Sequence, residues 1–298
     1  DFSEWVDVYR DLTRYEFDLD KSDDKGMVEV LNIQKQEANN SFAKYYERNY
    51  KDWLDGNTDS KPTLSHTLVK DYIFPLLDNG KQVFMLLIDN LRFDQWTIIK
   101  PLIEQYFRVE NESLYYSIIP TTTQYARNAI FAGMMPNEIR NKYRDYWVDE
   151  HEEGTKNKFE QELLKEQFKR FGRKTSISYN KILNLNAGRK LFENISNLMD
   201  TEFNVIVYNF VDMLSHARTE MEIIRELADN EASYRSLMLS WFEHSSLFDI
   251  IKYLASKDVS LMITTDHGSI KVTEPVKVVG DKNVNTNLRY KYGKSLAY

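Results

Sequence analysis

The chain carries several short runs of apolar, often β-branched residues, separated by longer amphipathic stretches. The clearest runs are residues 82–88, 114–119, 205–210 and 259–263, with a weaker one at 175–178. Runs that are apolar throughout are typical of strands buried on both faces of a parallel sheet. Helical patterns lie between them, for example at residues 159–170, 220–228 and 247–255. This alternation predicts an α/β fold with a mostly parallel central sheet and helices on both faces.

The first 58 residues show a different, purely helical pattern. Apolar residues from Trp5 to Tyr15 recur at spacings of three and four, and a second such series runs from Val30 to Tyr46. Such spacing places side chains on one face of a helix. We therefore expect a small helical bundle segment at residues 1–58. The polar, turn-forming residues 56–62 would link it to a main domain at residues 59–298.

Composition excludes several classes of protein. The 298 residues include no cysteine, which rules out a disulfide scaffold, a thiolate nucleophile and a Cys-ligated metal. The net charge of −7 argues against a general duplex-DNA binder. The longest strongly apolar run, from Val83 to Ile88, is far shorter than the roughly 20 residues of a membrane helix. With no secretion signal at the start, a cytoplasmic protein without a membrane partner is expected.

Residues whose side chains can bind a metal or take part in catalysis follow each of the four strongest predicted strands. Asp89 follows the first and the triplet Thr121–Thr123 follows the second, while Asp212 and His216 follow the third. Asp266 and His267 follow the fourth. In open α/β sheets, ligands bind outside the carboxyl ends of the strands, so these residues are expected at one edge. His244 is a reserve candidate for this site, although packing is the simpler expectation for it.

These residue types suit metal-assisted chemistry at phosphorus. Carboxylates and imidazoles without thiolates favour zinc or a harder ion such as manganese. Two such ions a few Å apart can clamp the attacking and leaving oxygens of a phosphoryl group. A threonine at a strand-to-helix junction lies beside free backbone N–H groups and becomes a nucleophile when a cation lowers its hydroxyl pKa. Taken alone, the threonines could equally be a helix cap.

The order of these motifs resembles the alkaline phosphatase superfamily in its PglZ-domain branch. The matching pattern is an Asp after the first strand, Pro-Thr-x-Thr from Pro120 to Thr123, Asp-x-x-x-His from Asp212, and Thr-Asp-His-Gly ending at Gly268. It is similar above all to PorX-type response regulators of type IX secretion, in which a receiver domain and a helical bundle precede a PglZ domain. Residues 1–58 would be the later part of the bundle, and the receiver domain is missing from this chain.

The resemblance implies an alkaline phosphatase-like fold and two divalent metal ions, most simply Zn²⁺, with Mn²⁺ as the other option. Asp89, Thr123, Asp266 and His267 would surround one ion, and Asp212 and His216 the other. Thr123 would be the nucleophile, with Thr121 as the alternative. The family's further His, in a His-Gly-Gly-type motif, is not found here. We therefore expect the second site, and the C-terminus of the domain, to be incomplete.

The substrate side is less sharply defined by the sequence. Arg127 and Asn128, in the first turns after Thr123, are candidates for contacts with phosphate oxygens. The C-terminal stretch interleaves tyrosines with basic residues and could either be ordinary surface or attract nucleic acid. Its basic residues are Lys271, Lys277, Lys282, Arg289, Lys291 and Lys294.

The resemblance implies a phosphodiesterase acting on cyclic or linear oligonucleotides, as the output domain of a two-component regulator of type IX secretion. The main alternative is a catalytically idle effector domain that binds a nucleotide or a partner. A third option is another enzyme of the superfamily, a phosphomonoesterase or metal-dependent mutase. The implied partners are the regulator's own receiver domain, a sensor histidine kinase, a type IX secretion component or sigma factor, and a second copy after phosphorylation.

Overall fold

The computed structural model describes residues 1–298 apart from 23, 59–60, 273, 282–283, 286 and 288. The described chain divides into two compact units. One comprises Asp1–Thr63 with Asn111–Tyr116, and the other comprises Leu64–Glu110 with Ser117–Tyr298. The expected boundary between residues 58 and 59 stays a prediction, because residues 59 and 60, within the expected linker, lie outside the described residues.

The first unit contains two helices, in agreement with the helical pattern of its sequence. It consists of α1 (Phe2–Leu19) and α2 (Lys25–Asp55). Asp1 caps the first turn of α1, and Asp24 accepts a hydrogen bond from the backbone of Met27 at the start of α2. The helices are joined through an aromatic cluster, in which edge-to-face and tilted ring contacts add to the burial of apolar area. Its members are Phe2, Trp5, Phe42, Tyr45, Tyr46, Tyr50, Trp53 and Tyr116.

The strand predicted at residues 114–119 does not form, so that prediction is wrong. The ring of Tyr116 packs 5.3 Å from Trp53 in the aromatic cluster, and its backbone N–H donates to Thr63. In the second unit, the backbone N–H of Ile118 donates to the hydroxyl of Ser65. Ile118 is buried and Ile119 is exposed, while the backbone N–H groups of Tyr116 and Ile118 bond to loop residues and residues 114–119 form no strand.

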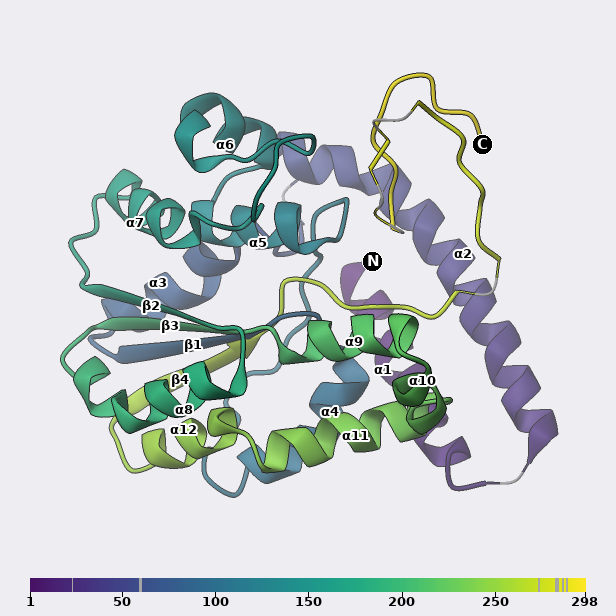
Figure 1. Ribbon diagram of the computed structural model, residues 1–298, viewed down its shortest axis with the longest axis horizontal. Coiled ribbons are helices and arrows are strands. Elements are labelled where there is room, and N and C mark those ends of the chain that lie inside the picture. The colour runs from purple at the N-terminus through teal and green to yellow at the C-terminus, as the bar shows by residue number, and fades with distance from the viewer. Residues whose placement is uncertain (23, 59–60, 273, 282–283, 286, 288) are drawn as a thin grey trace. The chain divides into compact units, whose positions relative to one another are not determined.

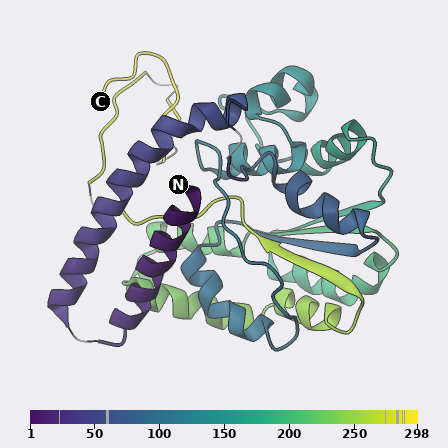
Figure 2. The same ribbon diagram turned by 180° about the vertical axis from the view of Figure 1, so that it is seen from behind.

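The second unit is built on a parallel sheet whose described strands follow the order β2-β3-β1-β4. Their bounds are β1 Gln82–Ile88, β2 Ile177–Ile182, β3 Phe203–Tyr208 and β4 Val259–Thr264. All three pairings are parallel, and Leu86 of β1 lies opposite Ile206 of β3 and Ile263 of β4. Seen from behind, β4 is the edge strand beside β1 (Figure 2). Three predicted strands are confirmed, and the weak candidate at 175–178 overlaps the start of β2.

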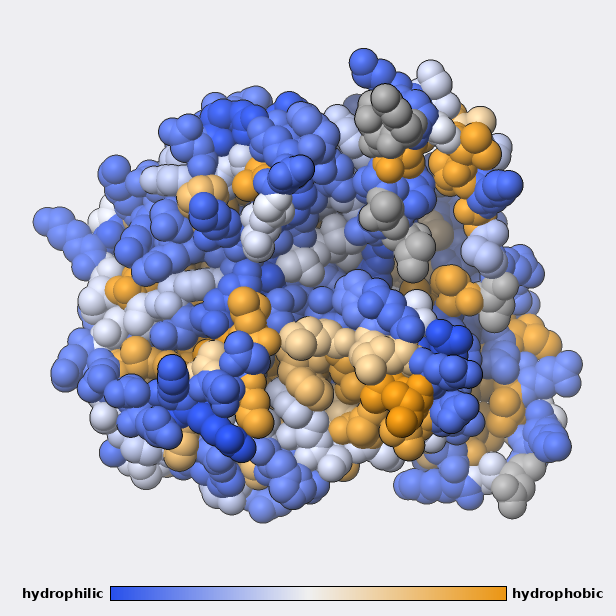
Figure 3. Space-filling view, viewed as in Figure 1, coloured by the Kyte–Doolittle hydropathy of each residue, from blue (hydrophilic) through white to orange (hydrophobic). Residues whose placement is uncertain are grey.

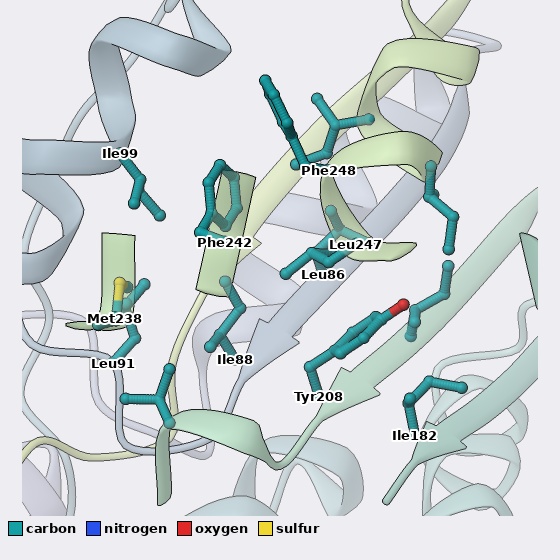
Figure 4. Packing of buried hydrophobic residues seen from close by; sticks show 14 of the residues in the cluster. Leu86, Ile88, Leu91, Ile99, Ile182, Tyr208, Met238, Phe242, Leu247 and Phe248 are labelled. Atoms are coloured by element: carbon teal, nitrogen blue, oxygen red, sulfur yellow. The ribbon is translucent and has the colours of Figure 1, made fainter. Parts of the chain in front are cut away.

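Helices cover both faces of the sheet, which confirms the predicted α/β architecture (Figure 1). One face carries α4 (Phe93–Ile103), α8 (Leu185–Glu193), α11 (Glu231–Glu243) and α12 (Ser246–Leu254). The other face carries α3 (Phe74–Asp78), α5 (Thr123–Ala132) and α7 (Glu160–Arg170). In the core, Leu86 and Ile88 of β1 face Phe242 of α11 and Leu247 of α12 (Figure 4). Each such buried side chain stabilises the fold by about 1.5–3 kcal/mol.

The remaining elements lie toward the carboxyl ends of the strands or connect the helices. They are α6 (Pro136–Lys142), α9 (Phe210–Glu220), α10 (Glu222–Leu227) and the short helical turns Val69–Ile73, Arg144–Tyr146 and Ile195–Leu198. Apolar side chains gather on the surface over α9 and α10 (Figure 3), and the exposed ones there include Met213, Met221, Ile223 and Leu227. Among the described helices, none is both long and apolar enough to cross a bilayer.

Candidate metal centre

Asp89 follows β1 directly, at the carboxyl edge of the sheet. Its backbone N–H donates to Tyr208 at 2.8 Å, which extends the β1–β3 ladder by one residue and fixes where the side chain leaves the strand. The carboxylate is buried. The next residue, Asn90, has φ 64°, a left-handed conformation that asparagine tolerates better than most residues. The chain therefore turns sharply just after the buried carboxylate.

Asp266 and His267 follow β4, the neighbour of β1 in the sheet. The backbone N–H groups of Asn90 and His267 donate to Oδ1 of Asp266, at 3.3 and 3.0 Å. The Nδ1 atom of His267 lies 3.1 Å from the carbonyl oxygen of Gly268. A proton on Nδ1 would be satisfied there, which leaves the lone pair on Nε2 facing Asp89. Parallel pairing of β1 with β4 is thus what brings these residues together.

Thr123 reaches the same place from the first turn of α5. Its Oγ1 atom lies 2.9 Å from Nε2 of His267 and 3.3 Å from Oδ1 of Asp89. Since the strand predicted before it is absent, a loop positions it instead, and Ser117 in that loop donates to the carbonyl oxygen of Asp266 at 2.8 Å. Asn157 donates to the carbonyl oxygen of Thr123 at 3.0 Å. The Thr123 hydroxyl faces the acidic cluster, while the residue at the N-cap is Thr122.

Asp89, Asp266 and His267 form a compact donor set. One ligand atom from each lies within 4.8 Å of the others, and all three residues are buried. Two carboxylates and an imidazole, with a hydroxyl beside them, are a ligand set that suits Zn²⁺ or Mn²⁺. Burial, followed by the negative charge of Asp266, raises the pKa of Asp89 to about 6. A divalent cation would offset this crowding of buried negative charge, so the residues fit such an ion.

The affinity of this site for a divalent ion should depend on pH. We expect it to weaken about tenfold for each pH unit below about 6, because Asp89 must lose its proton before a cation binds. Calorimetric titration with Zn²⁺ between about pH 5 and pH 7 measures this affinity, and a dissociation constant unchanged over that range would contradict the prediction.

The raised pKa of Asp89 also affects the stability of the metal-free protein. Asp89 contributes stability below its unfolded pKa of about 3.8, and this contribution is lost as the pH rises through about 6.

Asp212 and His216 lie one turn apart on α9, as their spacing predicted. Oδ2 of Asp212 is 3.7 Å from Nε2 of His216, whose side chain is 67% exposed, against 23% for Asp212. The amide of Asn90 donates to Oδ1 of Asp212 at 3.4 Å, which connects the pair to the buried cluster. Burial and the charge of Asp89 raise the pKa of Asp212. On its other side, Nδ1 of His216 lies 3.7 Å from Oε1 of the exposed Glu220, but among the described residues the pair belongs to no compact group of three possible ligands.

Arg127 and Asn128, predicted to contact substrate phosphate, are both about 1% exposed. The amide of Asn128 donates to the carbonyl oxygens of Gln124 and Lys156. The guanidinium of Arg127 is engaged by Asp89 and Glu160. The packing of α5 against α7 buries this face of the helix, which argues against the predicted phosphate contacts.

The other histidines do not join the cluster. His244 is exposed at the end of α11, where Nδ1 lies 2.8 Å from the carbonyl oxygen of Ser240, so the expected packing of this residue is not found. Of the basic residues in the C-terminal stretch, Lys282 lies outside the described residues. Arg289 donates to the hydroxyl of Thr121 at 2.6 Å and to the carbonyl oxygen of Gly268 at 2.8 Å. It therefore bridges the loops that carry Thr123 and His267.

Three residues near the site were not singled out as site residues from the sequence. Asn90 connects Asp212 with the buried cluster, Arg289 reaches the site from the C-terminal stretch, and Glu160 holds Arg127. Asn90 directly follows Asp89, so its position in the sequence could have identified it as a residue near the site. Glu160 begins an ordinary amphipathic helix, and nothing in its local sequence distinguishes it from a solvent-exposed glutamate.

Comparison with known families agrees with the observed fold. Residues 68–298 match the BREX system PglZ alkaline phosphatase-like domain. Residues 1–54 match the PorX response regulator linker domain. No curated protein matches the chain. Because the first match covers more than half of the chain, the protein belongs to the PglZ alkaline phosphatase-like family, with a linker domain of the PorX response regulator type at its N-terminal end.

Proposed function

We propose that the protein is a metal-dependent phosphodiesterase whose nucleophile is Thr123. Its substrate class would be cyclic or linear oligonucleotides, and it would be the output domain of a cytoplasmic regulator of type IX secretion. The observation that carries the proposal is the position of the Thr123 hydroxyl, 2.9 Å from His267 and 3.3 Å from Asp89. A hydroxyl at a helix N-terminus, beside a buried donor set for a cation, is what an activated nucleophile requires.

Each residue of the cluster has a role in this proposal. Asp89, Asp266 and His267, with the Thr123 hydroxyl, would hold one divalent ion, and Asp212 with His216 would hold a second. When bound, such ions supply Lewis-acid charge that lowers hydroxyl pKa values and stabilises charge at phosphorus. Loss of its proton to solvent makes the Thr123 oxygen an alkoxide. A helix leaves its first backbone N–H groups without partners inside the helix, and those at the start of α5 would stabilise negative charge that develops beside Thr123.

The covalent course has two steps. In the first, Oγ1 of Thr123 forms a bond to phosphorus while the bond to one ester oxygen breaks, and the departing alkoxide takes a proton from solvent. In the second, water forms a bond to phosphorus in the resulting threonine phosphodiester while the bond from phosphorus to Oγ1 breaks, which restores the Thr123 hydroxyl and releases a phosphomonoester. One water is consumed for each diester. His267 is not required as a general base in this scheme.

Arg289 is the residue that we expect to contact the phosphate of the substrate. Its described hydrogen bonds at the site go to the neutral oxygens of Thr121 and Gly268, and its charge interacts with those of Asp212 and Asp266, which places a positive group at this edge. We expect Arg289→Ala to raise KM for a diester by roughly ten- to a hundredfold with little change in kcat, since a lost charged hydrogen bond weakens ground-state and transition-state binding alike. Lys291→Ala is the matched control, and an equal rise in KM for both variants would contradict a specific role of Arg289.

Turnover of bis(p-nitrophenyl) phosphate with Zn²⁺ or Mn²⁺ tests the proposed reaction. The proposal predicts hydrolysis that is lost on chelation and restored by adding the metal. Faster hydrolysis of p-nitrophenyl phosphate than of the diester would favour a phosphomonoesterase instead. The same assay is to be repeated with the protein carrying its receiver domain, since a linker of the PorX type supports regulation by a receiver and a sensor histidine kinase.

The alternative function is a catalytically idle effector domain that binds a nucleotide or partner. It is favoured by the second pair of ligands, because His216 is largely exposed and the pair belongs to no compact group of three possible metal ligands among the described residues. This alternative predicts metal binding without turnover, also in the longer protein. Under either function, a second copy after phosphorylation and a secretion component or sigma factor are the proposed partners.

A further inference from the structure

We infer that Arg127 and Glu160 position Asp89 for metal binding, and that neither residue contacts substrate. The inference rests on the proposed function, because it assigns Asp89 a role as metal ligand. It concerns a line of buried, charged side chains that runs from β2 through α7 and α5 to the end of β1. Figure 1 shows α5 and α7 on the same face of the sheet to which β1 and β2 belong.

The two oxygens of Asp89 have different partners. Oδ1 faces Thr123 and His267, at 3.3 and 3.6 Å from Oγ1 and Nε2. Oδ2 accepts a hydrogen bond from Nη1 of Arg127 at 2.7 Å, and the same nitrogen lies 3.8 Å from Oδ2 of Asp266. Arg127 therefore holds the carboxylate in the rotation that presents Oδ1 to the cluster. Partners of this kind orient metal ligands and affect metal affinity strongly.

Arg127 is in turn fixed by Glu160. Nε of Arg127 donates to Oε1 of Glu160 at 2.5 Å, and both side chains are 1% exposed. The other oxygen of Glu160 accepts from Nζ of Lys181 at 3.0 Å and from the hydroxyl of Tyr179, both on β2. Because every group in this line is charged or polar and nearly all are buried, moving one leaves another without its partner.

The arrangement requires an arginine. Nε and Nη1 belong to one rigid plane, so the position of Glu160 determines where the donor to Asp89 lies. A lysine has a single nitrogen at the end of a flexible chain and cannot keep both carboxylates in this relation. With its nitrogens engaged by buried carboxylates and its side chain shielded from solvent, Arg127 acts through Asp89 and is a positioning residue.

The test is the affinity for Zn²⁺, measured by competition with a chromogenic chelator, in wild type and Glu160→Gln. This substitution keeps the size of the side chain and removes its charge. We expect the dissociation constant to rise by roughly ten- to a hundredfold. In the same variant kcat should fall while KM for the diester stays unchanged, which separates positioning from substrate binding. Arg127→Lys should weaken metal binding at least as much.

Two further variants keep the inference falsifiable if Glu160→Gln folds poorly. Tyr179→Phe removes one hydrogen bond to Glu160 and should weaken metal binding less than Glu160→Gln. Glu166→Gln, on the same helix, breaks only its ion pair with Lys169 and should leave the dissociation constant unchanged. Equal affinity for Zn²⁺ in wild type, Tyr179→Phe and Glu160→Gln would overturn this inference and leave the proposed function standing. Failure of the wild type itself to bind Zn²⁺ or Mn²⁺ would overturn the proposed function, and the inference with it.

Discussion

Replacing Thr123 by valine is expected to reduce diester hydrolysis by roughly a thousandfold or more, because the variant lacks the oxygen that would bond to phosphorus. Valine has nearly the shape of threonine, so the first turn of α5 should be preserved. The hydroxyl makes its described contacts with Asp89 and His267, and neither residue depends on it for its backbone position. The measurement is kcat for bis(p-nitrophenyl) phosphate with saturating metal, beside the midpoint of thermal unfolding.

Thr121→Val is the matched control, since Thr121 is the alternative nucleophile in the same loop. Its hydroxyl accepts a hydrogen bond from Arg289 at 2.6 Å and has no described contact with Asp89 or His267. We therefore expect Thr121→Val to keep most of kcat. Loss of turnover in Thr121→Val, with turnover retained in Thr123→Val, would transfer the role of nucleophile to Thr121.

Asp266→Asn should prevent stable binding of the metal at the buried cluster. Asp266 is fully buried, and its Oδ2 lies 4.0 Å from Nε2 of His267, so a neutral amide there would remove both a ligand and its charge. We expect the dissociation constant for Zn²⁺ to rise by at least about a hundredfold, since each ligand contributes a substantial part of the binding free energy of a metal. Elemental analysis after dialysis measures this as metal per chain.

The control for this variant is Asp249→Asn on α12. Asp249 is a surface carboxylate paired with Lys252 at 2.7 Å, and its substitution removes the same charge from a residue outside the buried cluster. Metal content should be unchanged in Asp249→Asn. Equal metal content in wild type and Asp266→Asn would show that Asp266 is not a ligand.

The sheet and the buried cluster were largely predictable because both depend on local patterns. Apolar runs identify β1, β3 and β4, and the residue after a parallel strand is carried to one edge by the topology. This places Asp89, Asp266 and His267 together. The i, i+4 spacing of Asp212 and His216 likewise predicted that they lie one turn apart, as they do on α9.

The failures have a common physical origin in tertiary context. The run at residues 114–119 has the composition of a strand, but the ring of Tyr116 packs against Trp53 in the helical unit and its backbone N–H bonds to Thr63. The phosphate contact predicted for Arg127 stays a prediction, but the sequence did not indicate that the packing of α5 on α7 buries this side chain beside Glu160. Sequence patterns report which residues are apolar or charged, and they do not report which charged residues become buried partners.

The central claim is that Asp89, Asp266 and His267 share one divalent ion next to Thr123, and anomalous diffraction from crystals grown with Zn²⁺ tests it most directly. The claim predicts an anomalous peak at about 2.0–2.2 Å from a carboxylate oxygen of each Asp and from Nε2 of His267. A stoichiometric zinc ion found elsewhere, with these three side chains bound only to one another and to Arg127, would contradict it.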